Sequence, residues 1–494
     1  MKNIVKLLLI VLLIAAQSCS EDFLDQLPST QQSPESITSV SDARIVMNGA
    51  YELLQENSYY ACNMITSNDA RADDMQAIDN GRIEDEYLYN YTPDIDYDNT
   101  IWGHPYRVVR HVNSILSFID DIEAEGTEIT EKESIKGQAL FIRALAHFDL
   151  CRMFGNAYSH DNGASLGVPI VAEVLSPDAK LERNTVAEVY AQVLADLNAA
   201  IPLLPDNDSY SRISVWAAKT LLARVYLYME NNAMAYSTAV DIINSGPFSL
   251  IDRADYVDSW SEEGTSESIF SIINSVADNT GLTGIGNLSD PKGYGQFVAS
   301  QDLMDLIASD SNDIRGELLY IDSKSDHAND STWGRVLKYP GLGNTQAVIK
   351  DFWENGVALP VAAVVSSVPV LRLSEVYLIA AEAAVKDGDV ANAEKYLNAI
   401  VERANPAATV ATDGVNLDRI LTERRKELMA EGHRFFDLIR NKRDIVRSMS
   451  VRIFDPNGTP LFIGWQDYRI LFPIPIDEIN ANPDITQNPG YKNN

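Results

Sequence analysis

The sequence is poor in the residues that most often carry catalysis or bind metal ions. It holds three cysteines and six histidines among 494 residues. Three cysteines are too few for a disulfide framework, although Cys62 and Cys151 could form one bond with each other. The sequence has no His-Glu-x-x-His, no paired Cys-x-x-Cys, no phosphate loop and no nucleophile elbow. We therefore expect no catalytic residues, no bound metal and no cofactor.

Positive charge and long apolar runs are also scarce. The chain has 39 basic residues against 71 acidic residues, a formal net charge of −32. Such a surface repels nucleic-acid phosphates, so we expect no nucleic-acid partner. Beyond the N-terminus, no apolar run reaches the roughly 20 residues that a membrane-spanning helix needs. The apolar fraction of 46% is ordinary for a globular protein, which predicts a folded body with a buried core.

The first residues have the composition of an export signal. Lys2 and Lys6 precede an apolar run that ends at Ala16, and two polar residues then lead to Cys19. This order predicts a signal peptide at residues 1–18. Its end resembles the lipobox of bacterial lipoproteins, which implies that Cys19 becomes the acylated N-terminus and carries palmitate. An ordinary secretory signal with a cysteine nearby is the alternative.

The segment after the cysteine, residues 19–40, is rich in Ser, Gln and Pro. It has too little apolar content to fold alone, which indicates a flexible, lipid-tethered linker. Its acidic start, Glu21 and Asp22, resembles the signal that places lipoproteins on the outer face of the outer membrane in Bacteroidetes-type bacteria. The resemblance implies a protein anchored in the outer membrane and facing the cell exterior.

Apolar residues recur at helical spacing along most of the remaining chain. The expected helices cover residues 41–55, 105–122, 133–154 and a segment that starts at Thr185. Thr185 and Glu188 stand at the spacing of a capping box. The stretches 214–246 and 373–404 fit helical pairs of the tetratricopeptide type, in which small residues allow close helix approach. Ordinary antiparallel helical hairpins are the alternative for both.

A different composition interrupts the helical pattern between these two pairs. Residues 247–370 are rich in Gly, Asp, Asn and Ser, with a strand-like piece at Ser268–Asn274 and one amphipathic helix at Phe297–Ser309. We therefore expect a mainly α fold: a tetratricopeptide-like helical-pair scaffold with an inserted loop-rich lobe containing short strands. The expected parts are an N-terminal helical part at 41–246, a ligand-binding lobe at 247–370, C-terminal helical pairs at 371–444 and an irregular segment packed on the scaffold at 445–494.

Several segments, in this order along the chain, resemble one protein family. They are Gly137–Gly155, Trp216–Tyr226, Leu371–Ala383, Glu423–Arg440, Leu471–Pro475 and Gln487–Tyr491. Together with the lipobox they resemble the SusD/RagB family of outer-membrane nutrient-binding lipoproteins. The resemblance implies a surface protein without catalytic activity that binds oligosaccharides, or peptides in the RagB branch. It also implies that the protein covers a TonB-dependent transporter of the SusC type, to which it delivers its ligand.

Aromatic residues concentrate in two loop regions, 59–99 and 260–353, and the family resemblance places ligand contacts in these regions. Sugar rings stack on Trp and Tyr, and their hydroxyls pair with Arg and Asn. The candidate ligand-binding residues are Arg71, Arg82, Tyr89, Tyr91, Tyr97, Asn99, Tyr294 and Trp333. Packing of these rings between the two lobes is the alternative.

Other readings of the polar residues stay open. Asp94, Asp96 and Asp98 alternate like the start of a calcium loop, but the sixth and twelfth positions are Asn99 and Pro105 instead of Gly and Glu. A structural calcium ion is therefore unsupported.

Two alternative functions for the whole protein remain. A helical-repeat scaffold that binds only protein is one of them. A surface hydrolase is another, and it would need two carboxylates about 5 to 9.5 Å apart.

Three charged residues stand in otherwise apolar helical runs. They are Arg143, Glu375 and Glu382. A buried charge is costly unless it is paired, so we expect these residues to form internal ion pairs or to cap neighbouring backbone groups.

Overall fold

The computed structural model describes residues 37–77, 81–94, 96–322, 333–448 and 461–492. Cys19 and the predicted signal peptide and tether up to residue 36 lie outside these ranges. The helices are α2 Val40–Gln55, α3 Asn63–Arg71, α4 Glu84–Leu88, α5 Asp96–Phe118, α6 Thr127–Phe154, α7 Tyr158–Asp161, α8 Val186–Ala200, α9 Val215–Tyr228, α10 Asn232–Ser245, α11 Ile285–Ser289, α12 Gln301–Ala308, α13 Gln346–Asn355, α14 Leu373–Lys386, α15 Val390–Ala404, α16 Leu417–Glu427, α17 Arg434–Arg440 and α18 Ile476–Ala481. The strands are β1 Met75–Gln76, β2 Ser268–Ile272, β3 Val298–Ala299, β4 Leu319–Asp322, β5 Trp333–Val336, β6 Val368–Arg372, β7 Ile445–Val446 and β8 Phe462–Ile463.

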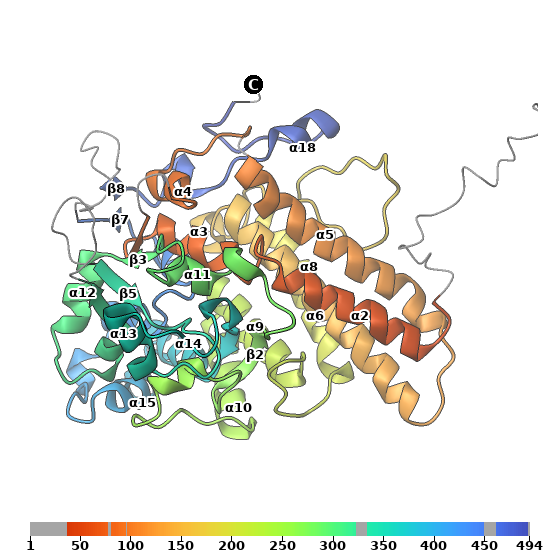
Figure 1. Cartoon of the computed structure of the whole chain (residues 1–494). Coiled ribbons are helices and arrows are strands. Elements are labelled where there is room, and N and C mark those ends of the chain that lie inside the picture. The colour runs from red at the N-terminus through yellow and green to blue at the C-terminus, as the bar shows by residue number, and fades with distance from the viewer. Residues whose placement is uncertain (1–36, 78–80, 95, 323–332, 449–460, 493–494) are drawn as a thin grey trace, which may run out of the picture.

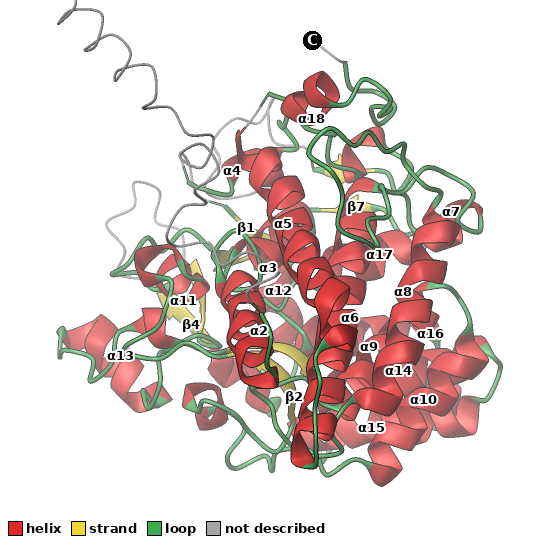
Figure 2. Cartoon of the chain, turned by 90° about the vertical axis from the view of Figure 1, so that its right-hand side faces the viewer, coloured by secondary structure: helices red, strands yellow, loops and turns green. Residues whose placement is uncertain are grey.

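Consecutive helices pack side by side to form the scaffold. Helix α5 packs on α6 and α6 on α8, while α9 packs on α10, α10 on α14 and α14 on α15. The long helices α2, α5 and α6 run beside one another on the right of Figure 1, and Figure 2 shows α8, α14 and α10 beyond them. The predicted mainly α fold of helical pairs is confirmed. Within the described residues, no helix is both long and apolar enough to cross a bilayer.

Local sequence explains where several of these helices begin. Ser39 and Asp42 form a capping box at the start of α2, and Thr185 forms the predicted box with Glu188 at the start of α8. The two pairs expected at 214–246 and 373–404 are α9–α10 and α14–α15. Most of their alanines are buried, among them Ala223, Ala239, Ala381 and Ala393, which fits the close helix approach that small residues allow.

Helix α5 begins earlier than the periodicity predicts. Its first residue is Asp96, so Pro105 lies inside the helix instead of opening it. A proline inside a helix removes one backbone hydrogen bond, which is why position 105 had suggested a start. Ring nitrogens of His104 and His111 each lie 2.8 Å from a backbone carbonyl of α2, those of Leu53 and Val46. Both histidines therefore join α5 to α2.

The loop-rich segment is inserted between two helices that touch. Helices α10 and α14 pack directly, although the chain between them includes α11, α12, α13 and strands β2 to β6. Strands β2 and β6 pair in antiparallel fashion where the segment leaves and rejoins the scaffold. The segment's short elements gather at the left of Figure 1.

A small antiparallel sheet joins the N-terminal part, which contributes β1, to the inserted segment, which contributes β3, β4 and β5. Its strand order is β1-β3-β5-β4 with antiparallel neighbours, and Met75 of β1 pairs with Ala299 of β3. In keeping with this pairing, Arg82, which follows β1 in the chain, contacts Gln296, which precedes β3. The predicted helix at Phe297–Ser309 starts only at Gln301, since Val298 and Ala299 belong to β3.

The structure adds a helix to the first loop region, residues 59–99, and it also settles whether Cys62 and Cys151 form a disulfide bond. A helix, α3, forms at Asn63–Arg71 within the stretch that had no helical periodicity. All its residues after the first are buried, including polar ones, so the interior and not a local amphipathic pattern holds it. Cys62 and Cys151 are both buried and free, so the bond left open above does not form.

Candidate ligand-binding site

The turn at Asp290–Gly295 presents Tyr294 on the surface. The backbone N–H of Tyr294 donates to the Asn287 carbonyl at 2.9 Å, which ties the turn to α11. Gly293 packs so closely on Asn287 that a Cβ there would overlap its carbonyl oxygen. Gly295 has φ +56°, a left-handed conformation that favours glycine. The Gly-Tyr-Gly sequence therefore fixes the direction in which the tyrosine ring points.

Arg82 reaches this ring from the first loop region. The carbon at the centre of its guanidinium lies 4.3 Å from the centroid of Tyr294, a distance typical of a cation–π contact. The Arg82 backbone N–H also donates to Oε1 of Gln296 at 3.0 Å. Two predicted site residues from distant parts of the sequence are thus brought together. The Arg82 side chain is exposed and Tyr294 is half-buried, so both remain open to solvent.

Helix α13 adds two more rings beside the same turn. The Trp353 indole N–H donates to Oδ1 of Asp290 at 3.0 Å. The Trp353 ring lies 5.1 Å from the ring of Tyr320 on β4, tilted by 58°. The Lys292 ammonium lies 4.0 Å over the Phe352 ring. These contacts make α13 and β4 the second wall of the site.

We call this surface the aromatic site. It comprises exposed or half-buried side chains from four segments: Arg82, Lys292, Tyr294, Tyr320, Phe352 and Trp353. Flat rings with polar groups at their edges can stack on a sugar ring and hydrogen-bond its hydroxyls. Lys292, Tyr320, Phe352 and Trp353 were not among the predicted residues. The Gly-Tyr-Gly turn is the sequence signal next to Lys292, and the Phe-Trp pair in one amphipathic helix is the signal for Phe352 and Trp353.

Three of the predicted contact residues lie in the interior instead. Arg71 is fully buried between the rings of Phe435 and Phe472, at 3.9 and 4.1 Å. The hydroxyl of Tyr89 donates to the Arg71 carbonyl, and that of Tyr91 donates to the Arg469 carbonyl. Burial raises the pKa of Tyr89 to about 12. A ligand from solvent does not reach these side chains, so the aromatic site does not include them.

The remaining predicted residues are placed only by their backbone. Tyr97 and Asn99 lie in the first turns of α5, and Trp333 begins β5. Their side chains lie outside the described part of the structure. Of the three aspartates with calcium-loop spacing, only Asp94 has a described side chain, and it accepts a hydrogen bond from the Thr92 hydroxyl. Among the described residues, no cluster of His, Cys, Asp and Glu could hold a metal ion.

The fold and this site define a class of helical-repeat proteins that display a ring-lined surface on an inserted lobe. Two family profiles match the chain. A SusD-like profile described as "Starch-binding associating with outer membrane" matches residues 22–227, and the SusD family profile matches residues 365–491. The chain belongs to the SusD/RagB family.

Individual relatives agree with this assignment over nearly the whole chain. A SusD-like protein of Formosa agariphila, P25, is 26% identical, with 98% of each chain covered. A crystal structure of a putative sugar-binding protein from Bacteroides vulgatus is 35% identical, with a TM-score of 0.84, 92% of this chain and all of that chain covered. A SusD superfamily structure from Bacteroides thetaiotaomicron has 34% identity, the same TM-score and the same coverage.

Proposed function

We propose that this chain is a surface lipoprotein that captures oligosaccharides at the aromatic site without cutting them. The observation that carries the proposal is the contact of Arg82 with Tyr294, because it assembles one open, ring-lined surface from two loop regions. The family profile that names starch binding and the putative sugar-binding relative support a glycan as the ligand. Tyr97 and Asn99 at the start of α5, and Trp333 at the start of β5, are proposed as further contacts.

We further propose that the captured glycan passes to a SusC-type TonB-dependent transporter. Support comes from the family, whose profile describes association with the outer membrane. Acylation at Cys19, with an acidic start to the tether, would place the protein on the exterior face of that membrane. A tagged copy, purified from its native outer membrane under mild detergent, should bring a β-barrel transporter with it.

Calorimetric titration of the mature protein against a panel of plant, host and microbial oligosaccharides tests the ligand class. The proposal expects binding of at least one glycan family, with the glycan recovered intact. Silence across the panel together with binding of peptides would transfer the chain to the peptide-binding branch. Release of shorter sugars by the purified protein would contradict the non-catalytic role.

A further inference from the structure

The second half of helix α13 has few buried contacts to hold it. Gln346 and Ile349 are the buried residues among its ten, and both lie in its first half. Phe352 and Trp353 follow in the last turns and are half-buried. Segments with few buried contacts open more readily than the core of a protein. The position of the Trp353 ring therefore depends on contacts with neighbouring elements.

One of these contacts comes from Asp290, the first residue of the turn that presents Tyr294. Oδ1 of Asp290 accepts the Trp353 indole N–H at 3.0 Å and the backbone N–H of Lys292 at 2.9 Å. The Asp290 carbonyl also accepts from the Gly293 N–H at 2.9 Å. A single side-chain oxygen therefore joins the turn to α13.

The Lys292 side chain adds a second link between the same two elements. Its ammonium donates to the Phe352 carbonyl and lies 4.0 Å from the centroid of the Phe352 ring. Because Asp290 holds the backbone of Lys292, it also fixes the point from which this side chain extends. Both links between the turn and α13 thus depend on Oδ1 of Asp290.

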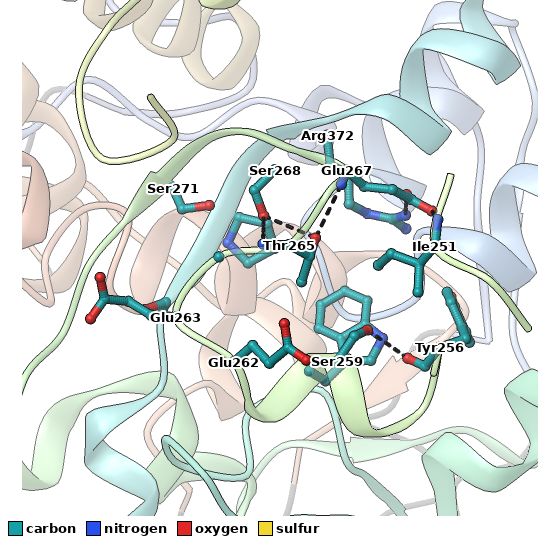
Figure 3. A pocket seen from close by; sticks show the side chains of 14 residues that line it. Ile251, Tyr256, Ser259, Glu262, Glu263, Thr265, Glu267, Ser268, Ser271 and Arg372 are labelled. Atoms are coloured by element: carbon teal, nitrogen blue, oxygen red, sulfur yellow. Dashed lines mark hydrogen bonds and ion pairs between the residues drawn. The ribbon is translucent and has the colours of Figure 1, made fainter. Parts of the chain in front are cut away.

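A turn before β2 shows a more local form of this arrangement. There the Thr265 hydroxyl accepts from the Glu267 N–H at 3.2 Å, and the Ser268 hydroxyl accepts from the Thr265 N–H at 2.9 Å (Figure 3). Donor and acceptor are at most three residues apart in that turn. Asp290 and Trp353 are 63 residues apart. Asp290 therefore stabilises its own turn and also sets where a ring on another element lies.

We propose that Asp290 is a positioning residue for the aromatic site, because it keeps the Tyr294 turn and the Trp353 ring in one arrangement. This inference rests on the function proposed for that site. Rings that are already in place lose less conformational freedom when a sugar binds. Both donors are neutral N–H groups, so the role needs an acceptor oxygen and not a negative charge. Asn also forms such a turn with the N–H two residues on, which makes Asp290→Asn the conservative variant and Asp290→Ala the disruptive one.

Fluorine NMR of the mature protein labelled with 5-fluorotryptophan tests this arrangement without a ligand. The chain has six tryptophans, and Trp353→Phe identifies the Trp353 signal by its loss. We expect Asp290→Ala to shift this signal by more than its linewidth, because the indole N–H loses its acceptor. Asp290→Asn should leave the signal close to its position in the parent.

Asp310→Ala is the matched control. Asp310 is half-buried like Asp290, and its carboxylate also accepts the N–H two residues on, that of Asn312, at 3.0 Å. It accepts as well from the side-chain amide of Asn405, just after α15, at 2.7 Å. The control therefore loses the same kinds of contact at a residue that is not part of the aromatic site, and the Trp353 signal should not move.

Calorimetric titration with maltoheptaose measures the effect on binding; this probe is chosen because the matched family profile describes starch binding. We expect Asp290→Ala to bind it about tenfold more weakly than the parent. Asp290→Asn and Asp310→Ala should stay within about twofold of the parent.

Three results would overturn the positioning role. They are an unmoved Trp353 signal in Asp290→Ala, a moved signal with unchanged binding, and equal effects of the Asn and Ala variants. Silence of the parent toward maltoheptaose would count against a starch-type ligand alone, and the fluorine spectra would still decide whether Asp290 positions the ring.

Discussion

Arg224 of α9 and Glu375 of α14 form a two-pronged ion pair inside the scaffold. The Arg224 Nε atom lies 2.7 Å from Oε1 of Glu375, and Nη2 lies 2.6 Å from Oε2. The remaining guanidinium contact goes to the Val370 carbonyl on β6 at 2.8 Å. The pair therefore joins two scaffold helices to the strand that returns from the inserted lobe.

Glu375→Gln should destabilise the protein strongly. Removing one partner of a buried pair leaves the other charge uncompensated and costs about 3–5 kcal/mol. Urea unfolding followed by circular dichroism would measure the loss. The control is Asp241→Asn, which breaks the exposed pair with Lys219 and should cost less than about 0.5 kcal/mol. Equal stability of the two variants would refute the structural role of the interior pair.

Stability should also fall steeply as the solution becomes acidic. Burial lowers the pKa of both His147 and His433 to about 4 from the usual 6.5. Since the unfolded state then binds protons more tightly, these groups favour folding above pH 6.5 and lose that effect as pH falls through 4. Glu375 contributes to the pH dependence of stability in a lower pH range. Burial alone would raise its pKa, but Arg224 lowers it to about 2, so its contribution is lost between pH 4.5 and 2.

Thermal unfolding measured from pH 8 to pH 3 checks this dependence. His147 also accepts a hydrogen bond from the Val171 N–H at its Nε2 atom, 3.1 Å away, which requires the neutral ring. His147→Gln should therefore flatten the fall between pH 6.5 and 4, relative to its own value at pH 8. An unchanged slope would mean that this histidine does not control acid stability.

The helical scaffold could be predicted from the sequence because its signals are local. The capping residues Thr185 and Glu188 and the helical spacing along α9 and α14 need no knowledge of the rest of the chain. The buried charges were predictable as well: Arg143 pairs with Asp196, and Glu382 pairs with Arg440. An unpaired charge in an apolar helix would be too costly.

The orientation of loop rings could not be predicted in the same way. Tyr91 and Tyr294 both lie in irregular segments rich in polar residues, yet one is buried against Phe472 and the other faces solvent. Neither segment has a period that assigns a face. The difference arises from distant partners, Phe472 for one ring and Arg82 for the other, and local sequence contains neither.

Tyr294 and Tyr91 therefore make a matched test of binding against stability. Tyr294→Ala should weaken glycan binding by about tenfold or more, as expected for a ring at the centre of a site, with little change in unfolding. Tyr91→Phe removes the hydroxyl that donates to Arg469 and should cost about 1 kcal/mol of stability, with binding unchanged. Calorimetry and urea unfolding on both variants separate the two roles, and a binding loss in Tyr91→Phe would contradict the buried placement.

The backbone of the turn should matter as much as the ring. In Gly293→Ala the new Cβ would overlap the Asn287 carbonyl, so the turn must move and carry Tyr294 away from Arg82. We expect glycan binding about tenfold weaker, equivalent to ~1.4 kcal/mol. Gly103→Ala is the matched control, because a Cβ there meets nothing within 4 Å on α5. That control should bind normally and gain up to about 1 kcal/mol in stability, and normal binding by Gly293→Ala would mean that the turn does not position the ring.

The lipid anchor gives a prediction outside the described residues. Cys19→Ser leaves the export signal intact but removes the thiol that would be acylated. In the native host we expect the variant to leave the outer-membrane fraction, and mass spectrometry of the parent should show acyl chains on the N-terminal cysteine peptide. A variant that is processed after a different residue yet still fractionates with the membrane would indicate retention by a protein partner. An unmodified Cys19 in the parent would instead favour the ordinary secretory signal.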